Sequence, residues 1–169
     1  MTSQQLPRLH GIVAAVDGSP TSETALAWAA RDASLRDVPL TVVHVQPSDE
    51  VGPWLDLPIS EEYLEARDRQ STEIVDRAVE LAGTAMEGRR RVPVEKLVLR
   101  GPVMPALLDV SKDSDMMVVG CRGLGALAGL LLGSTSSALV HHAHCPVAVV
   151  HEHSGSGIAV TAPVVVGVD

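Results

Sequence analysis

The chain has 169 residues, a formal net charge of −8 and 46% hydrophobic residues, with aromatic residues at only 2%. This length suffices for one domain with one buried core. The surplus of 21 acidic over 13 basic residues, with no basic stripe, argues against nucleic-acid binding. We find no signal-peptide pattern at the start and no apolar run near the ~20 residues of a membrane span. The two cysteines, Cys121 and Cys145, suit a reducing compartment, so we expect a cytoplasmic domain without a membrane partner.

The first half of the chain alternates apolar runs with amphipathic segments. Residues 11–16 form an apolar run that ends at Asp17, as in a strand buried on both faces. Ser19 and Pro20 then supply an N-cap and a first-turn proline for a helix. A second strand is predicted over 40–45. The apolar face of the first helix is expected to consist of Ala25, Leu26, Ala29, Ala30 and Ala33.

A long helix is predicted from Ser60 to Gly88, because acidic residues follow Ser60 and favour the positive end of the helix dipole. Its expected apolar face contains Leu64, Ile74, Val75, Ala78, Val79, Ala82 and Met86.

The second half continues the alternation of strands and helices. Strands are predicted over 92–99, 115–120 and 147–151, with helices starting after Gly101-Pro102 and at Ser134. Five strands with short connections and intervening helices predict a doubly wound, parallel five-stranded α/β sheet with helices on both faces, Rossmann-like in class. The fifth strand should be an apolar sheet edge that needs covering by a symmetric partner or a second domain.

Residues 152–163 form a Gly/Ser-rich linker between this domain, 1–151, and a second apolar hexamer. The hexamer at 164–169, VVVGVD, matches IVAAVD at 12–17, and both end in Val-Asp. One interpretation is a sixth strand added to the sheet. The other, which we favour, is that 164–169 is the first strand of a second copy of the domain.

Three features are expected to meet outside the carboxyl ends of the strands, where open α/β sheets bind ligands. They are Gly120-Cys-Arg-Gly123 after the fourth strand, Gly133-Ser134-Thr135-Ser136 at a helix start, and Asp17 after the first strand. Glycines allow close backbone approach, and amides at a helix start bind phosphate. Each feature also has a purely structural interpretation: a turn glycine, an N-cap at Ser134, or Asp17 capping the Ser19-Pro20 turn.

Two other nucleotide signatures are weak or missing. The glycines of Gly123-x-Gly125-x-x-x-Gly129 resemble a dinucleotide-binding motif, but they do not follow the first strand. No acidic residue ends the strand after them, so the match to that motif is weak. The only lysines, Lys96 and Lys112, do not follow a glycine loop, which excludes a P-loop kinase or GTPase.

The spacing resembles the ATP-binding branch of the universal stress protein family. That branch has a glycine, two residues, a glycine, nine residues, then a glycine followed by Ser or Thr. Here it reads Gly120-CR-Gly123-LGALAGLLL-Gly133-Ser134, without departure. The segments VDGSP (16–20), VVHV (42–45) and HCPVAVV (144–150) also match, so the resemblance spans about 10–151. Tandem copies are common in that family.

The resemblance implies ATP, with or without Mg²⁺, at the strand ends. Asp17 would lie near the nucleotide, where it could also hold a cation, and Val45 would meet the adenine through its backbone. Gly120, Arg122 and Gly123 would line the ribose and phosphates. The triphosphate would be held by Gly133, Ser134, Thr135 and Ser136.

Catalysis has weaker support than binding. The loop offers amides, hydroxyls and Arg122, but no lysine and no evident general base, so we expect hydrolysis to be slow or absent. The favoured function is an ATP-binding regulatory module that acts as a switch. The alternatives are a ligand-free dimerisation or interaction domain, as in family branches without the loop, and a slow ATPase.

A histidine-rich region invites a metal interpretation. His141, His142, His144, His151 and His153 lie near Cys145, but no pair has a clear ligand spacing. Histidines at a helix end also complement its dipole. We therefore expect no resident metal among these residues.

The repeated Val-Asp hexamer generates a first prediction. The parent gene should continue past the codon for Asp169 with a second βαβ domain. Reading the gene tests this, and a natural stop codon directly after Asp169 would refute it.

Overall fold

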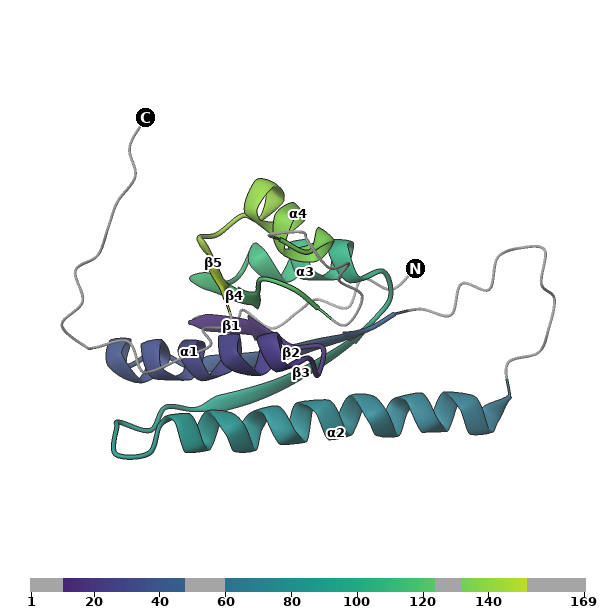
Figure 1. Ribbon diagram of the computed structural model, residues 1–169, viewed down its shortest axis with the longest axis horizontal. Helices are drawn as coiled ribbons and strands as arrows, with labels where there is room; N and C mark the ends of the chain where they lie inside the picture. Colours follow the sequence, from purple (N-terminus) through teal and green to yellow (C-terminus); the bar gives the residue numbers. More distant parts are fainter. Residues whose placement is uncertain (1–10, 48–59, 124–131, 152–169) are drawn as a thin grey trace.

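The computed structural model describes residues 11–47, 60–123 and 132–151 as a five-stranded parallel sheet with four helices (Figure 1). The strand order is β3-β2-β1-β4-β5. The elements, in chain order, are β1 (Ile12–Ala15), α1 (Pro20–Arg36), β2 (Leu40–Gln46), α2 (Glu61–Ala85), β3 (Val94–Arg100), α3 (Val103–Ser111), β4 (Met116–Gly120), α4 (Ser134–His142) and β5 (Val147–Val150).

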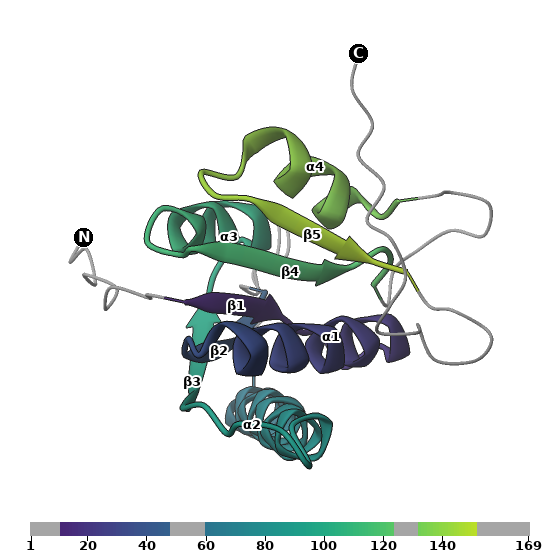
Figure 2. The same cartoon turned by 90° about the vertical axis from the view of Figure 1, so that its left-hand side faces the viewer.

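This order makes the sheet doubly wound. The chain runs outward from β1 through β2 to β3, then returns to place β4 on the other side of β1 and β5 beyond it. Helices α1 and α2 pack together on one face, and α3 and α4 pack together on the other (Figures 1 and 2). The predicted fold class is confirmed.

The two faces have separate cores because successive strand residues point to opposite sides of the sheet. Ile12 and Val42 face α1 and α2, whereas Val13 and Val43 face α3 and α4. The five apolar residues expected on α1, four alanines and Leu26, are all fully buried against the first face. Small alanine side chains allow α1 to lie close to the sheet, which fits an apolar composition nearly free of aromatic residues.

The long helix α2 follows the prediction along its C-terminal part only. Val75, Ala78, Ala82 and Met86 are buried in the core, as expected. Leu64 was expected on the same face, but it is 43% exposed, and the whole segment 61–66 is exposed. The first turns of α2 extend past the sheet (Figure 1). The spacing of apolar residues therefore identifies the buried face of α2 correctly. It does not show how far toward the N-terminus of α2 the core extends.

The element ends agree with the sequence to within three residues, the largest difference being the end of α2 at Ala85 rather than Gly88. Ser19 caps α1 by accepting from the Ser22 amide, with Pro20 as the first helical residue, and Ser60 caps α2 in the same way. Strand β5 is an edge strand, as expected, and its four residues are half-buried. Residues 152–169, which include the expected linker and second copy, lie outside the described residues. No helix in the described ranges is long and apolar enough to cross a membrane.

Gly83 in α2 gives a stability prediction. A Cβ built there meets no atom within 4 Å, so alanine fits without strain. Because alanine forms helix better than glycine, Gly83→Ala should raise the free energy of unfolding by about 0.5–1 kcal/mol. Urea denaturation would measure it, and a lower stability would show that this part of α2 is not the helix described.

Candidate functional site

A cavity of about 480 Å³ opens at the carboxyl ends of β1, β2 and β4. Its volume lies within the roughly 300–1,000 Å³ of small-molecule sites. The strand order reverses between β1 and β4, so the cavity lies where open α/β sheets leave a crevice for ligands. The described lining residues include all nine residues expected at the site: Asp17, Val45, Gly120, Arg122, Gly123, Gly133, Ser134, Thr135 and Ser136.

The Asp17 carboxylate, just after β1, contacts two neighbouring segments: the start of α1 and the loop after β4. Its Oδ1 accepts from the Ser19 amide at 3.0 Å and from the Ser19 hydroxyl at 2.6 Å, so the turn-capping interpretation is correct. Its Oδ2 faces the loop after β4, because a Cβ on Gly123 would lie only 2.5 Å from it. Turn capping therefore fixes the carboxylate in an orientation toward the cavity rather than away from it.

Gly120 and Gly123 are required by the protein's own packing. A Cβ on Gly120 would lie 2.9 Å from the carbonyl carbon and oxygen of Thr21. The Thr21 hydroxyl also donates to the Arg122 carbonyl, which ties the loop after β4 to the first turn of α1. That these glycines also allow phosphate approach stays a prediction. In the structure, Gly120 allows the approach of α1, and Gly123 makes room for the Asp17 carboxylate.

The first turn of α4 lines the cavity with amides that find no acceptor among the described residues. Gly133 is its N-cap residue and has no side chain with which to cap it, so the structural interpretation of Ser134 as the N-cap is wrong. The Gly133 amide donates to the Cys121 carbonyl at 2.7 Å. The amides of Ser134, Thr135 and Ser136 have no acceptor within the described residues, as the first turn of a helix without a side-chain cap requires. These three donors carry the partial positive charge of the helix start.

The three hydroxyl residues of this turn differ in exposure. Ser134 is exposed and Thr135 is half-buried, so both hydroxyls can reach a ligand. Ser136 is buried, and its hydroxyl lies 3.1 Å from the Cys121 carbonyl and 3.0 Å from that of Gly133. The Ser136 hydroxyl therefore helps to hold α4 against the end of β4. The amide is the group that this residue presents to the cavity.

Arg122 and Val45 lie at opposite sides of the cavity. Arg122 is exposed and follows β4, so it is accessible to an anion held at α4. The Val45 side chain belongs to the core shared with α3 and α4, which leaves its backbone for the cavity. Most of the nine-residue interval of the motif, 124–131, lies outside the described residues.

Apart from Val45, sequence reasoning missed the wall that β2 and α2 contribute. His44 and Gln46 line the cavity from β2, and Arg67, Gln70, Ser71 and Ile74 line it from α2. His44 Nδ1 lies 2.8 Å from the Val16 carbonyl, to which it donates. The available signal was that polar residues follow at alternate positions, 44 and 46, at the end of a largely apolar run.

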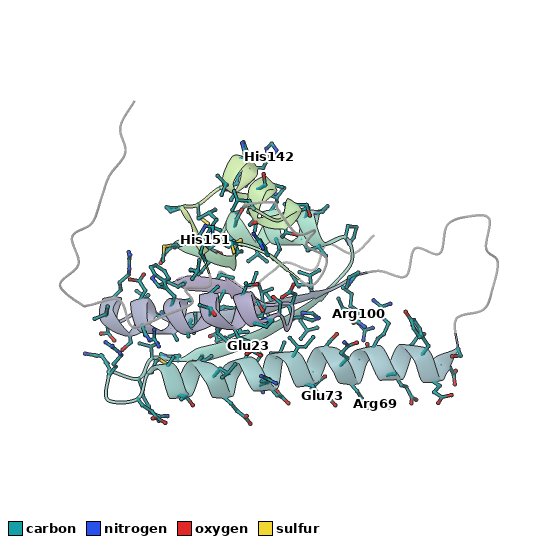
Figure 3. All side chains as sticks on the ribbon, in the orientation of Figure 1. Glu23, Arg69, Glu73, Arg100, His142 and His151 are labelled. Atoms are coloured by element: carbon teal, nitrogen blue, oxygen red, sulfur yellow. The ribbon has the colours of Figure 1, made fainter. Side chains whose placement is uncertain are left out.

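The histidine-rich end of α4 forms no metal centre in the part of the chain that the structure describes, where no three metal-ligating side chains gather. His142 points away from the sheet at the outer end of α4 (Figure 3). Burial raises the pKa of the half-buried Cys145 thiol, so it stays protonated and is a poor ligand at neutral pH.

The reversed strand order and the cavity define an α/β protein of the doubly wound class, in which the start of α4 has the amide donors and the partial positive charge that suit an anion. The model of the universal stress protein family matches residues 9–151. The chain therefore belongs to the universal stress protein family.

Relatives agree with this assignment. The universal stress protein Rv2623 of Mycobacterium tuberculosis H37Rv is 42% identical over 160 residues, covering 94% of this chain and 54% of that protein. This chain thus spans about half the length of the curated relatives it matches. The universal stress protein UspA of Lactobacillus plantarum has the same fold, with a TM-score of 0.62 at 18% identity, covering 86% of this chain and 99% of that one.

One solved relative contains a nucleotide. The universal stress protein of Archaeoglobus fulgidus in complex with dAMP is 26% identical, with a TM-score of 0.61, covering 85% of this chain and 98% of that one.

The packing at Gly120 predicts a stability defect. Gly120→Ala would force its Cβ against the α1 backbone, and overpacking of this kind costs about 1–3 kcal/mol. Thermal unfolding beside Gly83→Ala, the same substitution in open space, would measure it. Equal melting temperatures for wild type and Gly120→Ala would contradict the described contact between β4 and α1.

Proposed function

We propose that this domain binds ATP in the cavity between β1, β2 and β4 and acts as a cytoplasmic, nucleotide-dependent regulatory module of the stress response. The observation that carries the proposal is the row of three adjacent amides, of Ser134, Thr135 and Ser136, for which the described residues supply no acceptor. Such a row, at the positive end of a helix, fits a phosphate group. The intact glycine spacing and the dAMP complex of a relative support adenine nucleotide as the ligand.

The proposed orientation places the triphosphate at α4 and the base at β2. Strands β2 and β4 flank β1, so their ends lie two strand spacings apart, roughly 10 Å. A nucleotide with its phosphates on the α4 amides extends across Asp17 toward Val45, whose backbone would meet the adenine. Arg122 would balance phosphate charge from the solvent side.

Mg²⁺ is compatible with this arrangement as a partner of the phosphates. Magnesium sites that use nucleotide phosphates need only one or two protein carboxylates. Asp17 is the one acidic residue among the described residues that line the cavity. It would hold the cation, which in turn would neutralise phosphate charge.

Hydrolysis should be slow or absent. Asp17 is the carboxylate available as a general base within the described lining, and its Oδ1 already accepts two hydrogen bonds from Ser19. No lysine lines the described cavity. A turnover of about 1 s⁻¹ or faster, abolished by a change in the site, would contradict this part of the proposal.

The regulatory output would pass through an assembly. Strand β5 is a half-buried edge of apolar residues, which suits pairing with a second copy of the domain, either in the same chain or in a homodimer. The ligand-free alternative, a domain used only for association, gives no role to the α4 amides.

A matched pair of variants tests the phosphate site. Ser134 is the first helical residue, where proline is tolerated, and Gly133 has φ −73° and ψ 163°, which suits a residue before proline. Ser134→Pro removes one amide donor, whereas Ser134→Ala removes only the hydroxyl. Since a hydrogen bond to a charged group contributes about 1.5–3 kcal/mol, Ser134→Pro should weaken ATP binding by about 10–100-fold.

Isothermal titration calorimetry with ATP measures this, with Gly83→Ala as the control outside the site. Ser134→Ala should lose less affinity than Ser134→Pro, and Gly83→Ala none. Equal affinity of the wild type and Ser134→Pro for ATP would show that the triphosphate does not lie at α4. If the wild type binds no nucleotide, the remaining function is the alternative of a ligand-free domain used only for association.

A further inference from the structure

Two polar side chains on the wall where α2 packs on β2 have hydrogen-bonding atoms without a partner among the described residues. They are His44 on β2, which is 8% exposed, and Ser71 on α2, which is 4% exposed. His44 Nδ1 donates to the Val16 carbonyl at 2.8 Å, whereas His44 Nε2 and Ser71 Oγ have no hydrogen bond to a described residue. Because polar groups buried to this extent usually pair within the protein, these two atoms need an explanation.

Both atoms are open to the cavity. Among the described residues, the one side-chain nitrogen or oxygen that lacks a partner and is also closed to solvent is Gln46 Oε1. His44 Nε2 and Ser71 Oγ lack a partner without being closed, so both keep accessible surface. Since the two residues are more than nine-tenths buried and line the cavity, that surface lies on the cavity wall.

The bond to Val16 also fixes the chemistry that His44 offers to a ligand. A carbonyl oxygen can only accept a hydrogen bond, so the proton of the neutral imidazole lies on Nδ1 and Nε2 is an acceptor. Ser71 Oγ can donate its proton as well as accept one. The wall therefore offers a ligand one acceptor and one hydroxyl donor.

A gap in the sheet adjoins this wall. Strand β1 pairs with β2 only as far as Val43, and β2 continues past that point to Gln46. The Val43 carbonyl accepts from the Val16 amide, and backbone groups two residues apart on a strand point to the same side. The amide and carbonyl of Val45 therefore point into the gap, which is the place where the proposed adenine meets β2.

His44 and Ser71 lie on the side of the gap that faces α2. The Val45 side chain belongs to the core shared with α3 and α4, so the preceding His44 faces the other side of the sheet, where α2 packs (Figure 1). An adenine base presents its 6-amino group, a donor, and N7, an acceptor, along one edge. These two groups match the acceptor of His44 and the hydroxyl donor of Ser71.

We propose that His44 and Ser71 are specificity-determining residues that read this edge of adenine: the 6-amino group donates to His44 Nε2, and Ser71 Oγ donates to N7. The inference rests on the proposed function, since it deepens the nucleotide site. The opposite edge of the base, with N1, is left for the backbone of Val45. A purine with an oxygen at position 6 would place an acceptor against Nε2 and would bind more weakly.

Two variants remove the two contacts separately. In His44→Asn, the amide nitrogen can still donate to the Val16 carbonyl, but the acceptor that reaches the cavity is lost. Ser71→Ala removes only the hydroxyl. Thr72→Ala is the matched control, because it removes a hydroxyl from the exposed face of α2, next to Ser71 and outside the cavity lining.

Calorimetry compares ATP with purine riboside triphosphate, which lacks the 6-amino group, and with 7-deaza-ATP, which lacks N7. The wild type and Thr72→Ala should bind ATP about three- to tenfold more tightly than either analogue, because each analogue lacks one neutral hydrogen bond. His44→Asn should lose the preference over purine riboside triphosphate and keep the preference over 7-deaza-ATP. Ser71→Ala should show the reverse pattern. ITP, with an oxygen at position 6, should bind the wild type more weakly than purine riboside triphosphate does.

A purely structural role for the two residues does not produce this crossed pattern, since a loss of packing would weaken all probes alike. Equal binding of ATP and both analogues by the wild type, or equal losses for all probes in both variants, overturns the inference. Loss of a preference for ATP over 2′-deoxy-ATP in either variant would assign the contact to the ribose and overturn the adenine assignment. If His44→Asn does not fold, Ser71→Ala with 7-deaza-ATP decides the test.

The outcomes separate this inference from the proposed function. Each result that overturns the adenine contacts leaves the nucleotide site standing, because ATP still binds. Absence of binding to every probe contradicts the proposed function, and the inference with it. Ser134→Pro should weaken all probes alike, because the triphosphate is common to them.

Discussion

The end of β4 and the first turn of α1 touch backbone to backbone at Gly120, and the rest of the site depends on this approach. It brings Thr21 to the Arg122 carbonyl and Gly123 to the Asp17 carboxylate. A side chain at Gly120 would push the end of β4 away from the start of α1, next to the cavity. The glycine after β4 thus positions the site through the protein's own packing, and any benefit to a bound phosphate follows from that packing.

The cavity built on this contact has two chemically different ends. At α4, three amides without an acceptor among the described residues offer donors at the positive end of a helix, whereas the wall at β2 and α2 combines polar and apolar side chains such as His44 and Ile74. Asp17 lies between them at the end of β1, held by Ser19. Amide donors at the start of a helix suit a ligand with an anionic tail, such as a nucleotide. The dAMP complex of a relative supports the same class of ligand for the proposed function.

The sequence predicted the fold well because apolar periodicity and capping residues act locally. The caps at Ser19 and Ser60 and the buried face of α1 could be predicted from short patterns, as could the edge position of β5. The predicted burial of Leu64 was wrong, because periodicity does not show where a helix extends past the sheet on which it packs. The motif located the β4 and α4 wall, but Gln46 and Arg67 belong to a wall formed by packing α2 on β2, which no local spacing encodes. The reason for Gly120 was likewise non-local, since its neighbour is about a hundred residues earlier in the chain.

The most direct test of the account is an amide NMR titration of the ¹⁵N-labelled domain with ATP. Hydrogen bonds to phosphate should move the amide protons of Ser134, Thr135 and Ser136 downfield together and in a saturable manner. The start of α1, which Ser19 already caps, provides an internal reference that should move less. Saturable shifts elsewhere, with these three amides unmoved, would contradict a triphosphate at α4 and with it the central claim.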